Sequence, residues 1–274
     1  MFFKELYRYR YLLREIVAKN IKIQYRNSVL GIFWTLLQPL LTTLVLVLIF
    51  GGLFRSNRDY NFPVYVLTGR LLYEFYSQST KRAMRSVTGS ASVLKKVKVP
   101  KYIYPLSNII SNFVTFLISM VVLVGFLAYY LLWPSEKNPA PVITWNVLYA
   151  PIPLMILFLL CIGVGLILST LAVFFKDIEY IYDVFCMLLF YATPIIYDIN
   201  AQKSVALQYA LQANPLYSIV SMFRDCVLYG GNKLHPGWPF NPNHLMYSLA
   251  CALVLILIGG VAFWRKQDKF ILYI

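Results

Sequence analysis

Acidic residues are scarce in this chain of 274 residues. Only 11 aspartates and glutamates stand against 25 lysines and arginines, which gives a formal net charge of +14 at neutral pH. Charged residues make up 13% of the chain and hydrophobic residues 59%. A water-soluble domain with these proportions would expose large apolar patches. The composition therefore excludes an ordinary soluble protein and predicts an integral membrane protein.

The signatures of common catalytic sites are also missing from the sequence. There is no Gly-x-x-x-x-Gly-Lys-Ser/Thr phosphate loop, no His-Glu-x-x-His and no Gly-x-Ser-x-Gly. The two histidines, His235 and His244, stand in a segment rich in Pro, Gly and Asn, where solvated loop residues are the simpler interpretation. We therefore expect no catalytic residue, no metal ligand and no cofactor in this chain.

Long apolar runs are abundant instead. About 20 apolar helical residues cross a bilayer core of about 30 Å, and residues 32–54 contain no charge at all. A weaker segment, 63–84, carries polar residues, but counting it as a span puts the basic segments on one side. None of the runs alternates as the strands of a membrane barrel do. We predict an all-α membrane protein with six spans, at 32–54, 63–84, 106–132, 147–175, 181–197 and 245–264.

Lysine and arginine gather near the N-terminus, at residues 81–101 and in the tail after residue 264. With six spans these segments share one face, which the positive-inside rule makes cytoplasmic, so both termini are predicted inside. The same charges attract anionic membrane lipid. Nucleic-acid binding is the weaker alternative, because short basic segments beside spans are what topology alone produces.

The first 30 residues carry apolar side chains at helical spacing with basic residues between them. This pattern predicts an amphipathic helix lying in the cytoplasmic interface, and a purely basic topology signal is the alternative. No cleavable signal peptide is visible, because the segment lacks an uncharged apolar core.

The cytoplasmic loop at 86–105 has a helix-capable centre at 92–97, which Pro100 closes. A short basic helix between two spans is suited to docking a cytoplasmic partner, and an ordinary basic loop is the alternative.

The external segment at 198–243 is too apolar for a simple loop. Its two amphipathic stretches, 204–212 and 216–228, are separated by Asn214 and Pro215, a pair that favours a turn. Each stretch is too short to cross a bilayer, so we predict a re-entrant helical hairpin between spans five and six. Irregular backbone at membrane depth survives where protein shields it or where it lines a cavity, which suggests a gate.

Polar and aromatic residues in the second predicted span indicate a translocation path. Arg70 and Glu74 are four residues apart and can pair on one helix face. Charged residues within a span are functional candidates, although mutual neutralisation is a simpler explanation. Tyr73, Phe75 and Tyr76 cannot all face lipid, and we expect some of them to line the path.

Several short motifs occur in a characteristic order: IKIQYRNSVLGIFWTLLQPLL at 21–41, FPVYVLTG at 62–69, LKKVKVPKYIYPLSN at 94–108, GVGLILSTLAVFFKDIEYI at 163–181, TPIIY at 193–197, NPL at 214–216 and FRD at 223–225. Together they resemble, along nearly the whole chain, the membrane (permease) subunit of bacterial ABC exporters for cell-surface polysaccharides of the O-antigen, teichoic acid and capsule types. Arg70 and Glu74 depart from the family pattern, which usually has apolar and aromatic residues there.

The resemblance implies a homodimer in the bacterial cytoplasmic membrane, with two separate ATP-binding subunits that bind ATP and Mg and carry out hydrolysis. The substrate would be a polyprenyl-pyrophosphate-linked glycan that enters from the inner leaflet. The implied coupling residues are Ser92, Val93, Leu94, Lys95, Lys96, Val97 and Pro100. Tyr25 and Arg26 would lie where the substrate enters, although topology also explains Arg26. The implied external gate comprises Pro194, Tyr197, Asn214, Pro215 and Arg224.

Two other functions stay open. An ABC exporter of a small lipid or drug is the nearer alternative. An integral-membrane enzyme that modifies glycans is the more distant one, because it would need a histidine or a carboxylate cluster near the interface.

Overall fold

The computed structural model describes residues 7–26, 28–53, 60–96, 99–135, 138–199, 204–232 and 238–273. Helices dominate, and these residues contain no β-strand, which confirms the predicted all-helical fold. The predictions for Val97 and His235 lie outside the described residues.

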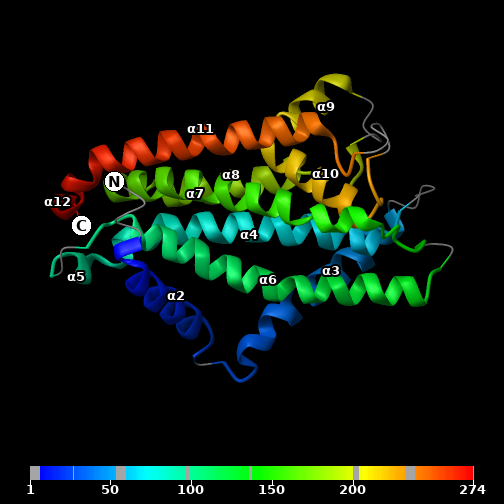
Figure 1. The fold of residues 1–274 in the computed structure, drawn as a ribbon, viewed down its shortest axis with the longest axis horizontal. Coiled ribbons are helices and arrows are strands. Elements are labelled where there is room, and N and C mark those ends of the chain that lie inside the picture. The colour runs from blue at the N-terminus through cyan, green and yellow to red at the C-terminus, as the bar shows by residue number, and fades with distance from the viewer. Residues whose placement is uncertain are drawn as a thin grey trace.

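Long helices run along a common direction in an elongated bundle (Figure 1). They are α4 (Phe62–Gly89), α6 (Ile103–Leu132), α7 (Pro151–Phe174) and α11 (Pro242–Lys266), and α3 (Trp34–Leu53) runs obliquely to them. Helix α4 packs against α6 and α7, and α7 packs against α11. Most residues of α4 are buried, so this helix forms the centre of the bundle.

Four stretches of the described residues are long and apolar enough to cross a membrane: Gly31–Gly51, Ile103–Leu132, Trp145–Phe174 and Pro242–Tyr273. Helix α4 carries several charges, and α8 (Ile178–Ala192) has only 15 residues. The structure therefore supports a helical membrane protein with these four candidate spans.

Shorter helices lie at the two ends of the bundle. The start of α2 (Arg10–Tyr25), α5 (Ala91–Leu94) and α12 (Phe270–Tyr273) share one end, whereas α9 (Val205–Gln212) and α10 (Pro215–Val227) lie at the other (Figure 1). Short 3₁₀ turns complete the chain at Gly31–Phe33, Trp145–Tyr149 and Gln267–Lys269. We call the two ends the α5 end and the α10 end.

An asparagine, with a proline one or two positions after it, marks the start of three helices. The side chains of Asn61, Asn214 and Asn241 each accept a hydrogen bond from a backbone N–H in the first turn of α4, α10 and α11. A proline stands at one of the first two positions of each helix, where its missing N–H is not needed. The Asn214-Pro215 pair thus ends one helix region and begins the next.

Several helix ends differ from the predicted ranges. Helix α4 runs on to Gly89, past the predicted 84, and α6 begins at Ile103, before the predicted 106. Helix α8 stops at Ala192, short of Tyr197, because Thr193 precedes a proline and is extended, with φ −99° and ψ 125°. Helix α5 occupies Ala91–Leu94 rather than 92–97, since Ser90 already ends α4 and starts the next turn.

Glycines allow α7 and α11 to approach closely. A Cβ atom on Gly259 would lie 2.5 Å from the carbonyl oxygen of Gly163, and one on Gly163 would lie 2.7 Å from the Ile256 nitrogen. Small residues at such crossings are typical of helices packed within membranes, where backbone contact supplies much of the attraction.

Candidate functional site

An arginine is buried between α10 and the first half of α4. The Arg224 side chain donates to the carbonyl oxygen of Pro194 at 2.8 Å and to that of Tyr65 at 2.9 Å. Longer bonds of 3.4 Å reach Thr68 Oγ1 and the Ile195 carbonyl. Its guanidinium carbon lies 3.4 Å from the centre of the Tyr65 ring, a cation–π contact. Arg224 is only 4% exposed, so these protein partners take the place of the hydrogen bonds that water would make to its guanidinium. The same bonds hold α10 against α4.

Gly69 leaves room for this arginine. A Cβ atom at position 69 would lie 2.5 Å from Arg224 Nη2 and 3.3 Å from the Ile195 Cα. The guanidinium can therefore reach the turn after α8 only because α4 has no side chain at this point.

The turn at 193–197 is held by further bonds. The Tyr65 hydroxyl donates to the carbonyl oxygen of Tyr197 at 2.9 Å, and Asn214 Nδ2 donates to Thr193 Oγ1 at 3.0 Å. We call Arg224, Asn214, the turn 193–197 and their α4 partners the outer cluster.

Four predicted gate residues, Pro194, Tyr197, Asn214 and Arg224, thus lie together, and Pro215 starts the adjoining helix. Sequence reasoning missed Tyr65, Thr68, Gly69 and Thr193. They stand inside the FPVYVLTG and TPIIY motifs, but no local pattern connects those motifs to Arg224.

Asp225 lies beside this cluster and is buried. Its Oδ2 accepts a hydrogen bond from Asn232 Nδ2 at 2.9 Å. Burial raises the pKa of Asp225 to about 6, although the bond from Asn232 opposes the rise.

The predicted pair on α4 is present and belongs to a larger network. Arg70 Nε and Glu74 Oε2 are 3.9 Å apart, and both side chains are about one-fifth exposed. Glu74 Oε1 accepts hydrogen bonds of 3.0 Å from Gln38 and from Gln78. Arg70 Nε also donates to Thr42 Oγ1 at 3.1 Å. The network connects α4 to α3 across the middle of the bundle.

The aromatic residues predicted for the path lie in different surroundings. The Tyr73 hydroxyl donates to the carbonyl oxygen of Cys186 on α8. Phe75 packs against Phe116 with ring centres 4.7 Å apart, and both Phe75 and Tyr76 are buried in the core. Among the predicted path residues, Glu74 and Phe75 line one pocket, described next, whereas Arg70, Tyr73 and Tyr76 are not part of its lining.

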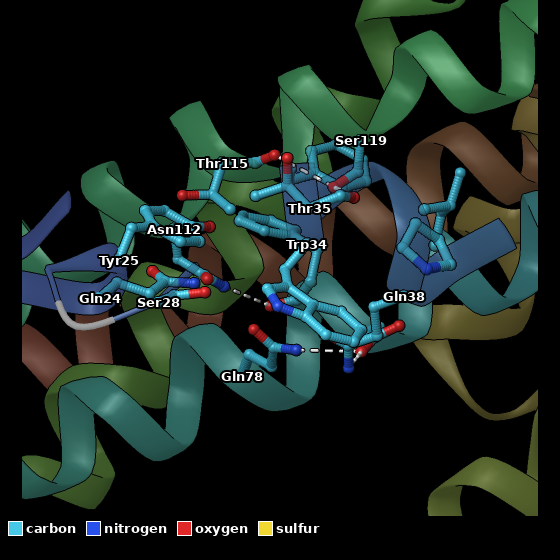
Figure 2. Close-up of a pocket in the computed structure, with 15 residues that line it drawn as sticks. Gln24, Tyr25, Ser28, Trp34, Thr35, Gln38, Gln78, Asn112, Thr115 and Ser119 are labelled. Atoms are coloured by element: carbon cyan, nitrogen blue, oxygen red, sulfur yellow. Dashed lines mark hydrogen bonds between the residues drawn. The ribbon is translucent and has the colours of Figure 1, made fainter. Parts of the chain in front are cut away.

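A polar pocket of about 250 Å³ opens between α2, α3, α4 and α6 (Figure 2). We call it the mid-bundle pocket, and its lining is Gln24, Tyr25, Ser28, Trp34, Thr35, Gln38, Pro39, Leu71, Glu74, Phe75, Gln78, Asn112, Thr115, Phe116 and Ser119. The Tyr25 hydroxyl is buried near Thr115 without a hydrogen bond of normal geometry, and burial raises the pKa of Tyr25. Arg26, the neighbouring predicted residue, is exposed and is not part of this lining.

The predicted coupling residues divide into two groups. Leu94 is buried in an apolar cluster with Val87, Tyr104, Val173, Phe263 and Phe270. The side chains of Ser92, Val93, Lys95 and Lys96 are exposed, and Pro100 is partly buried. Leu94 therefore anchors α5 to its own chain, and the exposed residues form the surface that a partner can reach.

These features define the class of the protein. Apolar helices surround a polar network and a pocket at mid-depth, and a buried arginine organises one end of the bundle. Polar groups gathered inside a membrane bundle are typical of a transport protein.

The comparison with known proteins gives the family. Residues 11–228 match the ABC-2 type transporter family, and the chain belongs to this family.

Relatives match over nearly their whole length. The chain is 29% identical over 268 residues to the O-antigen export system permease protein RfbA of Myxococcus xanthus, covering 97% of this chain and 96% of the relative. A protein of the same name from Klebsiella pneumoniae is 31% identical over 263 residues, with 94% and 93% covered. The polysialic acid transport protein KpsM of Escherichia coli is 23% identical over 262 residues, with 93% and 92% covered.

Proposed function

We propose that this chain is the permease subunit of an ATP-driven exporter that moves a cell-surface polysaccharide across the bacterial cytoplasmic membrane. The observation that carries the proposal is the polar network of α3 and α4 together with the mid-bundle pocket, because polar groups at this depth mark a substrate pathway. The relatives named above, which are polysaccharide export proteins, support the substrate class.

We infer six spans, with α4 and α8 added to the four candidate spans. Most residues of α4 are buried, Thr68, Ser79 and Thr80 among them, and Arg70 lies beside Glu74, which supports a span despite its charges. The basic α5 end is then cytoplasmic and carries both termini. The outer cluster faces outward, and α9 and α10 form the re-entrant hairpin that shields it.

We assign ATP and Mg to a separate ATP-binding subunit, since the sequence has no phosphate loop. Its docking surface is the exposed part of α5. A second copy of the chain completes the pathway, and apolar side chains such as Leu48 on α3 and Val184 on α8 are available for that contact. The glycan enters as a polyprenyl-pyrophosphate conjugate beside Tyr25 and Arg26 and leaves at the outer cluster.

Deletion of the gene tests the function. We expect the deletion strain to lose its surface polysaccharide and to accumulate lipid-linked glycan on the cytoplasmic side, and the wild-type gene should restore both. Normal surface polysaccharide in the deletion strain would overturn the proposal, and loss of a small exported lipid instead would favour the other transport function.

The gate role has its own test. A single cysteine placed as Asn214→Cys, with the four native cysteines replaced, should react slowly with an impermeant external thiol reagent at rest. Its labelling should rise during export, because the bond network of Thr193 and Arg224 must open for a polymer. Fast labelling in both states would contradict a gate here.

A further inference from the structure

Most of the residues that line the mid-bundle pocket are polar. The pocket joins the end of α2 and the start of α3 to the middle of α4 and α6. In the view of Figure 2 the Trp34 indole lies within the lining, with Gln38 and Gln78 along one edge and Thr35 and Asn112 along the other.

The hydrogen bonds of the lining leave a defined set of polar atoms free. A carboxylate only accepts, so Gln38 and Gln78 turn their amide nitrogens to Glu74, and their amide oxygens accept no hydrogen bond from the described residues. The Asn112 amide nitrogen likewise donates a hydrogen bond to Ser79 Oγ at 2.8 Å, and the Asn112 amide oxygen accepts none from the described residues.

Donors face the same space. The Gln24 oxygen accepts from Arg82 at 2.8 Å, which leaves the Gln24 amide nitrogen as a donor. The Tyr25 hydroxyl is buried without a hydrogen bond of normal geometry and is a second donor. Ser28 Oγ accepts a hydrogen bond from the Gly31 nitrogen, so its own hydroxyl hydrogen can still be donated. The pocket thus offers both donors and acceptors, which is what a hydroxyl group requires.

The charge of the lining excludes one class of ligand. Among the described residues the lining contains no lysine or arginine, and Glu74 is its only carboxylate. Phosphate and pyrophosphate are recognised most often by arginine or lysine, and the Arg82 guanidinium beside the pocket is bonded to Gln24. A neutral ligand is therefore favoured.

The volume and shape of the pocket limit which neutral ligands can bind in it. The volume of about 250 Å³ is below the range of roughly 300–1,000 Å³ usual for drug-sized ligands, so a single ring fits. The indole of Trp34 is about half exposed and supplies a flat apolar face, and the free amides surround it.

We infer that the mid-bundle pocket binds a neutral sugar residue, the one attached directly to the lipid pyrophosphate of the exported glycan. This inference rests on the proposed function. The sugar ring lies against Trp34, its hydroxyls bond the free amides of Gln24, Gln38, Gln78 and Asn112, and the pyrophosphate stays outside the pocket.

The test is equilibrium binding of radiolabelled lipids to the full chain in nanodiscs prepared without sugar detergents. The probes are polyprenyl pyrophosphate alone and the same lipid bearing one glucose or one N-acetylglucosamine. We expect a sugar-bearing lipid to bind about 10-fold more tightly, the gain from one or two net hydrogen bonds. Trp34→Leu and Gln78→Leu should remove this preference, so that the sugar-bearing lipids bind no more tightly than the bare lipid. Trp264→Leu, at an exposed tryptophan outside the pocket, is the matched control.

Binding of the bare lipid shows that a variant is folded. A chain in which Trp34 is the only tryptophan gives a second readout with the pocket intact, because sugar-bearing lipid should change its emission and bare lipid should not. A sugar preference that survives both pocket substitutions, or no preference in the wild type, overturns the sugar site and leaves the export function standing. Failure of the wild type to bind any of these lipids instead refutes a lipid-linked substrate, and the sugar site with it.

Discussion

Replacing Gly69 with alanine should displace the Arg224 side chain from its hydrogen-bonded position. The new methyl group would lie 2.5 Å from Arg224 Nη2, far inside van der Waals contact. The arginine is the flexible partner, so it gives way before the helix backbone does. It then loses the strong bonds to Pro194 and Tyr65.

The magnitude follows from these contacts. Overpacking a buried site costs about 1–3 kcal/mol, and a hydrogen bond to a charged group contributes about 1.5–3 kcal/mol. Alanine gains up to about 1 kcal/mol over glycine from helix propensity. We expect Gly69→Ala to lower the free energy of unfolding by about 2–4 kcal/mol. Gly89→Ala, in the last turn of the same helix, meets no atom within 4 Å and should be neutral or slightly stabilising.

A double-mutant cycle isolates the contact. Unfolding is measured in detergent micelles for Gly69→Ala, Arg224→Ala and the pair. If the methyl group acts through the arginine, Gly69→Ala should cost less than about 1 kcal/mol once Arg224 is truncated. Additive effects, or a Gly69→Ala variant as stable as Gly89→Ala, would refute this account of the outer cluster.

Three further predictions concern other parts of the chain. Val93→Asp should weaken co-purification with the ATP-binding subunit and leave the thermal midpoint of the isolated chain unchanged, because Val93 is exposed. Leu94→Asp should lower that midpoint because it buries a charge. The reverse pattern would contradict the docking surface. Gly259→Ala should lower the thermal midpoint by forcing α7 and α11 apart, and Gly260→Ala, with open space around it, should not. The pKa of Asp225 is raised to about 6, so the folded chain loses stability as pH rises through that value and Asp225 ionises. Asp225→Asn removes this ionisation and should therefore stabilise the chain at pH 7.5, by at most about 3 kcal/mol. The gain in stability should shrink towards pH 5. If the gain in stability of Asp225→Asn did not change with pH, the ionisation of Asp225 could not be its cause.

Local features of the fold were readable from the sequence. Apolar runs predicted the helical membrane class, the spacing of Arg70 and Glu74 predicted their pairing, and Asn214-Pro215 predicted the break before α10. Pro194 likewise indicates that α8 ends before it. Each of these rests on residues that are neighbours in sequence, where the geometry of one helix turn or one proline ring decides the outcome.

The contacts that organise the site join residues far apart in sequence. Arg224 bonds Tyr65 across 159 positions, and nothing near either residue indicates the other. The family resemblance implies that Leu94 is a coupling residue, but its side chain is buried against Phe263 and Phe270 of its own chain. Helix packing in three dimensions determines such partners, and no local pattern in the sequence encodes that packing.

The anchoring of α5 sets an order of events during synthesis. Leu94 shares its cluster with Phe263 and Phe270, residues that the ribosome adds some 170 positions later. At about 5–20 residues per second this delay is roughly 10–30 s. Throughout that interval the nascent chain has its basic loop but lacks the two aromatic side chains that complete the apolar cluster around Leu94. If an ATP-binding subunit docks on α5, as proposed above, it should engage chains synthesised through Phe270 more readily than truncated ones.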